Sequence, residues 1–266
     1  MMEEKRDKKE TNKPIKRNIT VYEMDLSQCA KYQDMEGSWV IWMLISGIIL
    51  CSKNLYGGIF LILISVIIFI LYKNCSKNVS ATHYNLALEY MEKNDMIKAK
   101  EELYDSIKSN PNNKVSYVLL SSIFYKESNF KKTIENLLNS GVLEVKNSKY
   151  NYLIAACYFN MNEYSNSIKH LKLVKYEEQD PMRTIRDILL GKAYYLKGEY
   201  KQALKVFNEV KDNNKQINEH LIEFNYFLGM TYLKLNDYDK AKAILLKVYE
   251  EDKNYKEIED LISGIK

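Results

Sequence analysis

Two apolar runs precede a long region in which apolar and polar residues alternate at the spacing of amphipathic helices. The first run, 39–51, reads WVIWMLISGIILC and the second, 56–72, reads YGGIFLILISVIIFILY, with no charged residue in either. A helix needs about 20 residues to cross a hydrocarbon layer about 30 Å thick. With their uncharged flanks both runs approach this length. The pattern therefore predicts a transmembrane helical hairpin over 37–73, with helices at about 37–53 and 55–73.

Aromatic residues at the ends of both runs favour a membrane location. Trp and Tyr collect at membrane–water interfaces, and here Trp39 and Tyr72 would share one interface while Tyr56 would mark the other. Two crossings joined by the short turn SKNL are the preferred interpretation, and a single crossing stays open. A helix in a soluble core is disfavoured because the runs lack a polar face. A signal peptide is disfavoured because the first run starts late and no cleavage site precedes it.

Lysine positions around the hairpin predict its orientation. Lys31, Lys73 and Lys77 flank the hairpin on the side of its two ends, whereas Lys53 alone lies in the turn. Because Lys and Arg are enriched on the cytoplasmic side, we expect a multi-pass protein of the cell membrane with its N-terminus and the downstream region in the cytoplasm. Residues 1–36 are rich in balanced charges and poor in aliphatic residues, which predicts a disordered cytoplasmic tail.

Downstream of residue 80, five segments repeat the same order of residue types. Each has a small residue, an aromatic residue three positions later, a turn, and then an aromatic residue or Met. The small residues are Ala87, Ser121, Ala155, Gly191 and Gly229, at spacings of 34, 34, 36 and 38 residues. The aromatic residues that follow them are Tyr90, Phe124, Tyr158, Tyr194 and Tyr232. A period of this length indicates stacked copies of one helical unit.

The turn of each copy separates two predicted helices. The turns carry residues that mostly tolerate the left-handed conformation that ends a helix, and these are Asn94, Ser128, Asn162, Gly198 and Asn236. The second helix is expected to begin at Met96, Phe130, Tyr164, Tyr200 and Tyr238. Small residues let the two antiparallel helices approach closely. No pair can bury its apolar face alone, so the copies must stack into one continuous core.

These columns resemble the tetratricopeptide repeat, whose period is 34 residues. The resemblance covers 80–255, with repeats starting near 80, 114, 148, 184 and 222, although the usual Trp is missing. The copies are longer around 174–183 and 209–220, where extended helices or loops are expected. Residues 256–266, with Ile258, Leu261 and Ile262 on one face, predict a capping helix. The expected fold is all-α: a transmembrane hairpin, a solenoid of about five helix–turn–helix repeats, and a cap.

Composition and charge agree with a helical interaction protein. Only nine Gly and three Pro occur in 266 residues, and the formal net charge is +4. The charge is spread along the chain, which is not the footprint of a nucleic-acid-binding protein. The four cysteines share no close spacing, so neither a disulfide framework nor a zinc site is indicated. His83, His170 and His220 occupy unlike repeat positions, and no catalytic or phosphate-binding motif is present. We therefore expect no enzyme activity, no cofactor and no metal.

The resemblance also implies where a partner would bind, because in this family the first helix of each pair lines a concave surface. The candidate binding residues at its inward positions are Tyr84, Leu88, Tyr125, Lys126, Tyr152, Phe159, Lys192, Tyr195, Tyr226 and Met230. Chaperone-binding members clamp a carboxylate with Lys and Asn, but here the matching positions hold Tyr84, Leu88 and Leu119, so that activity is not carried over.

Apolar and aromatic lining of this kind indicates a protein partner that supplies a peptide or an amphipathic helix. The expected function is thus a membrane-anchored scaffold that presents an aromatic groove beside the membrane. The alternative is a structural component that braces a membrane complex or forms a homo-oligomer, with the groove occupied internally.

Overall fold

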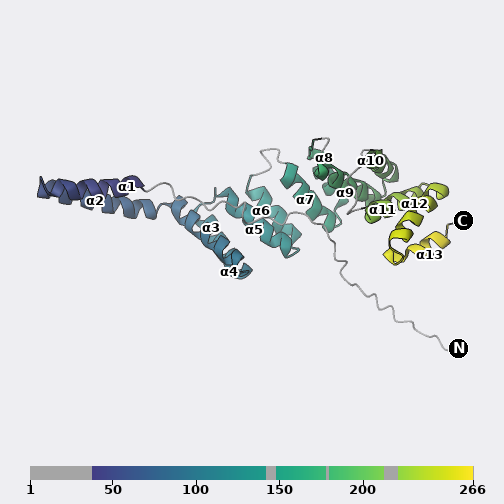
Figure 1. Ribbon diagram of the computed structural model, residues 1–266, viewed down its shortest axis with the longest axis horizontal. Coiled ribbons are helices and arrows are strands. Elements are labelled where there is room, and N and C mark those ends of the chain that lie inside the picture. The colour runs from purple at the N-terminus through teal and green to yellow at the C-terminus, as the bar shows by residue number, and fades with distance from the viewer. Residues whose placement is uncertain (1–37, 142–147, 178–179, 213–220, 266) are drawn as a thin grey trace, which may run out of the picture.

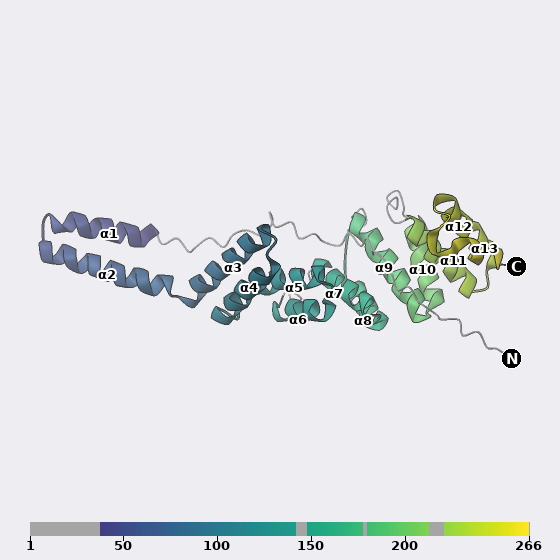
Figure 2. The ribbon, with the colours of Figure 1, turned by 90° about the horizontal axis from the view of Figure 1, so that it is seen from below.

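The computed structural model describes residues 38–141, 148–177, 180–212 and 221–265. Within these ranges the regular secondary structure is helical. Figure 1 shows an elongated molecule in which the antiparallel pair α1 and α2 projects from one end and the C-terminal helices lie at the other. Figure 2 shows α1 and α2 side by side and the following helices stacked in pairs along the long axis. The charged tail expected over 1–36 lies outside the described residues.

The two apolar runs form the helices α1, Ser38–Cys51, and α2, Leu55–Lys73. Between them Asn54 caps α2, because its side-chain oxygen accepts a hydrogen bond from the Gly57 N–H at 3.0 Å. Gly58 allows close packing, since a Cβ there would collide with Cys51. The predicted helical hairpin is therefore present as a pair of packed helices.

Only α2 has the length and composition to cross a membrane among the described helices. Its 19 residues span about 28 Å, whereas the 14 residues of α1 span about 21 Å. The first helix is shorter than the predicted 37–53 because it ends at Cys51, where the backbone turns through Ser52 and Lys53. By length and composition, α2 is thus the one candidate for a membrane span among the described helices.

The hairpin joins the repeats through a very short link. Only two residues, Asn74 and Cys75, separate the end of α2 from helix α3, Ser76–Glu92. The Asn78 side-chain N–H₂ donates to the Tyr72 carbonyl oxygen at 2.7 Å, which ties the first turn of α3 to the last turn of α2. Helix α3 begins a few residues before position 80, near which the first repeat is expected, so it extends toward the hairpin.

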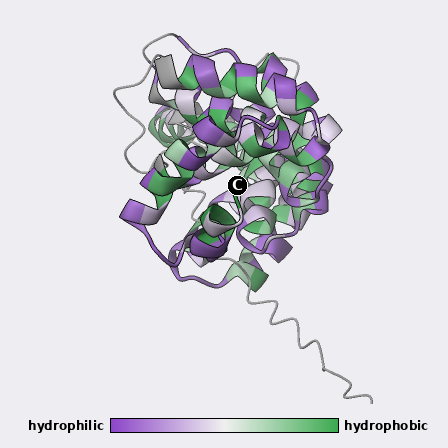
Figure 3. Cartoon of the chain, turned by 90° about the vertical axis from the view of Figure 1, so that its right-hand side faces the viewer, coloured by the Kyte–Doolittle hydropathy of each residue, from purple (hydrophilic) through white to green (hydrophobic). Residues whose placement is uncertain are grey.

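Five antiparallel helix pairs follow, each with its second helix beginning at the residue that the pattern predicts. The pairs are α3 with α4 (Met96–Ser109), α5 (Lys114–Lys126) with α6 (Phe130–Asn139), α7 (Ser148–Asn160) with α8 (Tyr164–Leu173), α9 (Pro181–Lys197) with α10 (Tyr200–Asp212), and α11 (Leu221–Lys234) with α12 (Tyr238–Glu251). Seen from the C-terminal end, Figure 3 shows hydrophilic and hydrophobic residues on the ribbons of the same helices, as expected for amphipathic helices.

All five predicted turn residues adopt the left-handed conformation. Their φ angles are +59° at Asn94, +57° at Ser128, +61° at Asn162, +88° at Gly198 and +61° at Asn236. In each turn, the residue that follows the left-handed residue donates its N–H to the carbonyl oxygen of the aromatic residue four positions before the left-handed one. Asp95, for example, donates to the Tyr90 carbonyl oxygen at 2.8 Å. Each first helix therefore ends in the same hydrogen-bonded way, which fixes the angle at which the second helix returns.

Small residues set the spacing within the pairs. Ala87, Ser121 and Ala155 are fully buried or nearly so. A Cβ on Gly191 would collide with the Phe207 ring, and one on Gly229 would lie 2.6 Å from Leu245 Cγ. The second helices fill the space that the missing side chains leave. Buried residues of α3, α4 and α5 form one apolar cluster, and buried residues from α6 through α12 form a second, larger one.

The longer copies differ from the regular frame at their junctions. Helix α9 has 17 residues and begins at Pro181, where the Asp180 side chain caps it by accepting from the Met182 N–H at 2.8 Å. The extended-helix expectation therefore holds for this junction. Of the second long junction, 209–220, the first residues belong to α10, and residues 213–220 lie outside the described residues.

The C-terminal cap starts later than predicted. A 3₁₀ turn, Tyr255–Glu257, precedes the short helix α13, Ile258–Ser263. Lys256 and Glu257 have φ angles of +47° and +55°, and this left-handed backbone cannot belong to a continuous α-helix. Ile258 is fully buried in an apolar cluster with Leu245 and Val248 of α12.

Candidate partner-binding face

The ten candidate residues divide into two groups by exposure. Five are buried, with exposed fractions of 1% to 7%: Tyr84, Leu88, Tyr152, Phe159 and Lys192. Tyr125, Tyr195, Tyr226 and Met230 are half-buried, and Lys126 is exposed. Five of the ten candidates are thus enclosed by the protein's own packing, and whether they contact a partner stays a prediction. The five buried side chains fill the core between repeats, because each first helix packs closely on its neighbour in the stack.

We use the term first-helix face for the five accessible residues Tyr125, Lys126, Tyr195, Tyr226 and Met230. Their role in binding a partner stays a prediction. Tyr195 and Tyr226 come together at the C-terminal end of the array, where both rings lie near Phe227, with centroids at 5.5 and 5.6 Å. Tyr84 and Leu88 belong to the separate core cluster of the first two repeats. The structure thus gathers the candidates of repeats 4 and 5 but not those of repeat 1.

An aromatic pair recurs at the turn edge of the three middle repeats. The last aromatic residue of the first helix contacts the aromatic residue that opens the second: Tyr125 with Phe130 at 6.0 Å, Phe159 with Tyr164 at 5.7 Å, and Tyr195 with Tyr200 at 5.5 Å. The rings are inclined by 57–65°, an arrangement that aromatic quadrupoles favour. These contacts hold Tyr125 and Tyr195 of the first-helix face in fixed positions.

Lys192 occupies an aromatic environment between repeats. Its Nζ lies 2.7 Å from a carboxylate oxygen of Glu223, and 5.3 and 5.4 Å from the ring centroids of Phe159 and Phe227. A buried ammonium requires such a partner, because an unpaired charge away from water is strongly disfavoured. Sequence reasoning missed Glu223, although its position three residues before Tyr226 on α11 places it on the same helix face.

A second lysine closes the C-terminal end of the first-helix face. Lys256 Nζ lies 4.5 Å from the ring centroid of Tyr226, 4.9 Å from that of Phe227 and 5.0 Å from that of Tyr255. Tyr255 in turn packs on Tyr226 at 5.5 Å with an angle of 71°. We call Tyr226, Phe227 and Tyr255 the aromatic cage. The sequence pattern placed Lys256 in the capping helix and gave no sign of its contact with α11. The contact depends on the left-handed backbone of Lys256 and Glu257, which the pattern does not predict.

The tyrosine hydroxyls of this region stay protonated. Burial, followed by the neighbouring Tyr226 and Tyr200, raises the pKa of Tyr195 to about 12. Burial and the Glu257 carboxylate raise the pKa of Tyr226. Burial is also the main cause of the raised pKa of Tyr255, with Glu223 and Asp252 among the lesser ones. The aromatic cage therefore consists of neutral rings, with the carboxylates of Glu223, Asp252 and Glu257 nearby.

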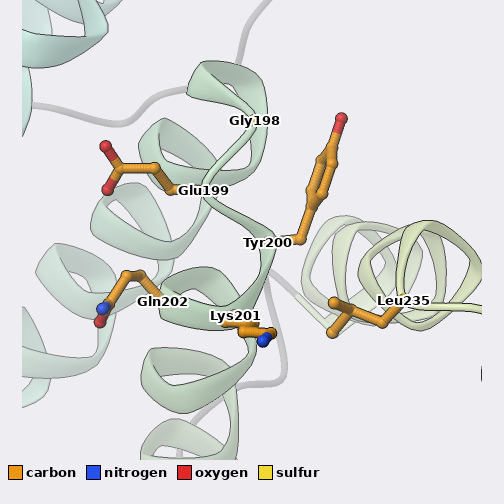
Figure 4. A pocket seen from close by; sticks show the side chains of 6 residues that line it. All are labelled: Gly198, Glu199, Tyr200, Lys201, Gln202 and Leu235. Atoms are coloured by element: carbon orange, nitrogen blue, oxygen red, sulfur yellow. The ribbon is translucent and has the colours of Figure 1, made fainter.

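A shallow pocket of about 450 Å³ lies at the turn edge between repeats 4 and 5. It is lined by Gly198, Glu199, Tyr200, Lys201, Gln202 and Leu235. Figure 4 shows the Tyr200 ring and Leu235 on one side of the turn, while Glu199 and Gln202 point to the other. The polar groups do not converge, so the pocket offers an apolar wall and no arrangement for catalysis.

No cluster of three or more His, Cys, Asp or Glu that could hold a metal occurs among the described residues. Cys157 is buried, and burial raises the pKa of its thiol to about 12, so it is a poor nucleophile. His170 stacks on Tyr158 at 5.6 Å, and its Nδ1 lies 3.1 Å from the Asn151 side-chain oxygen. His170 is therefore held by structural contacts, and neither residue belongs to the aromatic cage.

Stacked antiparallel helix pairs with left-handed turns define an α-solenoid, and the comparisons with known proteins identify its kind. Residues 222–255 and 188–216 match two tetratricopeptide repeat families, and residues 93–174 match the family described as anaphase-promoting complex, cyclosome, subunit 3. The helical array therefore contains tetratricopeptide-like repeats, and tetratricopeptide repeat proteins are generally protein-interaction scaffolds.

Solved structures show the same fold. MamA is 19% identical, with a TM-score of 0.53 over 63% of this chain and 94% of its own. YrrB, described as a TPR protein with an unusual peptide-binding site, is 17% identical, with a TM-score of 0.56 over 67% of this chain and 89% of its own. PilF of Pseudomonas aeruginosa is 12% identical, with a TM-score of 0.52 over 84% and 96%. Among curated protein sequences, none matches this chain.

Proposed function

We propose that this protein is a membrane-anchored scaffold that binds a peptide or an amphipathic helix of a partner protein on its first-helix face, next to the membrane. The observation that carries this proposal is the two-residue link between the apolar helix α2 and the first repeat helix α3. Such a link ties the position of the array to that of the hairpin.

The anchor is supported by the exposure of the hairpin. Large apolar side chains of α1 and α2 face outward, including Trp42 at 69%, Tyr56 at 85% and Phe60 at 66%, and only 11% of the apolar window in α2 is buried. An exposed apolar surface of this extent marks a membrane or protein contact. We place both helices in the bilayer, with the turn at Lys53 on one side and both ends of the hairpin on the cytoplasmic side.

Partner binding is supported by the half-exposed tyrosines. Tyr195 and Tyr226 present rigid aromatic surface with few rotatable bonds, which is typical of residues that dominate binding energy. YrrB, which has the same fold, is described by its peptide-binding site. By analogy, the first-helix face of this chain takes a partner segment, with Tyr125, Tyr195, Tyr226 and Met230 as contacts and Lys126 at the rim.

The test uses the full chain in native membranes with a photo-crosslinking residue at Met230. A matched control places the same residue at Tyr104, which is 48% exposed on α4, a second helix. We expect the chain to remain in the membrane pellet after alkaline extraction, and the Met230 position to yield an adduct with one membrane protein that the Tyr104 position does not. Release into the alkaline supernatant, or the same adducts from both positions, would contradict the proposal.

A structural role is the second candidate, because Tyr255 and Lys256 already cover part of the first-helix face. A protein that braces a complex through self-association would place its own residues there. In that case the Met230 adducts would join copies of this chain, and size measurement in mild detergent would give a single oligomer.

A further inference from the structure

We propose that the C-terminal end of the first-helix face binds two consecutive residues of the partner, an aromatic residue followed by a lysine. In the unbound protein, Tyr255 and Lys256 occupy this site in place of the partner's aromatic residue and lysine. The inference rests on the proposed partner-binding function and specifies the chemistry of the partner. The site consists of Tyr226 and Phe227 on α11, with Glu223 one turn before them.

The first argument is that this chain shows the site occupied. The Lys256 ammonium lies 4.5 and 4.9 Å from the ring centroids of Tyr226 and Phe227, and the Tyr255 ring packs edge-on against Tyr226. Ammonium groups at this distance from ring faces are attracted by the ring quadrupoles. The contacts come from side chains of two consecutive residues, so a short partner segment with the same two residue types can reproduce them.

The second argument is charge. Glu223 and Asp252 lie close enough to Tyr255 to contribute to its raised pKa. Glu223 also pairs with the Lys192 ammonium at 2.7 Å. Displacing Lys256 would remove one positive charge from a region that holds these two carboxylates, so the vacated site would favour a positively charged side chain over a neutral or acidic one.

The third argument is the backbone of the closing segment. Lys256 and Glu257 are consecutive non-glycine residues with φ angles of +47° and +55°. This conformation is unfavourable for residues with a side chain and persists only where other contacts hold it. A partner that replaces the contacts of Tyr255 and Lys256 allows the segment to relax, which makes the closed arrangement displaceable.

The closing segment is held mainly by Tyr255, which packs against the apolar cluster of Leu245, Val248 and Ile258. Tyr255 is half-buried and Lys256 and Glu257 are exposed, whereas Ile258, the next residue, is fully buried and anchors α13. Helix α12 ends at Glu251, so only a few residues between two fixed points need to move. Because only molecules with an open site can bind, the apparent Kd for a partner equals the intrinsic Kd divided by the fraction of open molecules. Occupation of the site by Tyr255 and Lys256 therefore weakens the apparent affinity.

The experiment measures fluorescence anisotropy of a labelled peptide with the full chain in detergent micelles. The probe is the chain's own sequence 252–259, DKNYKEIE, and the matched probe, DKNYQEIE, differs only by Gln in place of the lysine that follows the tyrosine. Three proteins are compared: the unmodified chain, the double variant Tyr255→Ser with Lys256→Ser, and the control Lys253→Ser. Lys253 lies 5.7 Å from the Tyr249 ring, away from the aromatic cage.

We expect the double variant to bind the lysine probe about ten-fold more tightly than the unmodified chain does, because its site is open. It should prefer the lysine probe over the glutamine probe by about five-fold or more. The control should match the unmodified chain. Equal binding of both probes by the double variant, or no gain over the unmodified chain, overturns the inference.

Circular dichroism establishes whether the double variant keeps its helices. If it does not, Lys256→Gln replaces it, since Gln keeps the side-chain length while removing the charge; the lysine probe should still gain affinity, and an unchanged affinity counts against the inference. Failure of this inference is distinguishable from failure of the proposed function. A specific Met230 adduct with a membrane protein together with no probe preference would leave the scaffold in place and remove only the lysine site.

Discussion

The Lys192 ammonium and the Glu223 carboxylate, 31 residues apart, lie 2.7 Å from each other and join α9 to α11 across two neighbouring repeats. The lysine side chain is 8% exposed and the glutamate side chain 37%. The lysine therefore depends on this partner more than the glutamate does, since water can solvate the carboxylate but not the ammonium.

Glu223→Gln is expected to lower the free energy of unfolding by about 1–2 kcal/mol, because it leaves the enclosed Lys192 charge without a carboxylate. Lys192→Met keeps most of the side-chain volume, and adding it to Glu223→Gln should recover part of the loss. Urea unfolding of the full chain in detergent, followed by circular dichroism, gives the cycle of four proteins. Strictly additive effects of the two changes would contradict this account. Lys240→Met, which breaks the exposed pair with Asp237, is the control and should leave unfolding unchanged.

The close approach of α9 and α10 gives a second prediction. Gly191→Ala places a methyl group into the Phe207 ring and should destabilise the chain by about 1–3 kcal/mol despite the higher helix propensity of Ala. Phe207→Leu in the same protein should relieve part of this cost. Gly264→Ala is the control, since a Cβ there would meet only the Asp260 and Leu261 carbonyl oxygens at ordinary distances. Equal unfolding midpoints for the Gly191 and Gly264 variants would show that the helices can separate freely.

The left-handed turn of repeat 2 gives a third prediction. Ser128 has a φ angle of +57°, which costs a residue with a Cβ about 1 kcal/mol or more relative to Gly. Ser128→Gly should therefore raise the free energy of unfolding by about 0.5–1 kcal/mol, measured by thermal and urea unfolding. Ser128→Ala keeps the Cβ and serves as the matched comparison. A stabilising effect of both changes would point to the lost hydroxyl rather than to the backbone.

Sequence reasoning reached the repeat architecture because its signals are local. A turn residue such as Asn94 or Asn236 tolerates the positive φ angle that the turn requires. The aromatic residue before it, such as Tyr90, accepts the backbone hydrogen bond that ends the first helix. Each signal recurs at nearly constant spacing, so five weak indications reinforce one another.

The exposure of residues on the first helices was not predictable in the same way. Whether Tyr152 is buried at 1% or half-exposed like Tyr226 depends on how tightly neighbouring repeats stack, and no single repeat contains this information. The hydrogen bonds among Ser80, Ser106 and Asn113, with distances of 2.8–3.2 Å, also escape prediction. Serines at unrelated positions form no periodic signal and meet only after the first two repeats pack.

The contact of Lys256 with α11 shows the same limit. The apolar residues Ile258 and Leu261 indicate a cap. The position of the Lys256 side chain, however, depends on left-handed backbone at Lys256 and Glu257, and neither residue is a glycine or an asparagine, the types that would indicate this conformation. Chain segments held by tertiary contacts against their local preference are the places where a sequence pattern fails.

The number of membrane crossings can be decided with the native cysteines. Cys75 is exposed directly after α2, Cys51 ends α1 at the turn of the hairpin, and Cys157 is buried with a raised pKa. In intact cells, a maleimide that does not cross membranes should leave Cys29 and Cys75 unmodified if both helices cross and the repeats are cytoplasmic. Permeabilisation should then expose both, while Cys157 stays unmodified because its thiol is enclosed and protonated.

Single-cysteine variants separate the alternatives. With only Cys29 or only Cys75 retained, two crossings require both variants to label on the same side of the membrane. Labelling of Cys29 from outside, with Cys75 still protected, would show that α2 crosses alone and that α1 does not return the chain to the cytoplasm. Labelling of Cys75 in intact cells would instead place the repeats outside and reverse the orientation inferred from Lys31, Lys73 and Lys77.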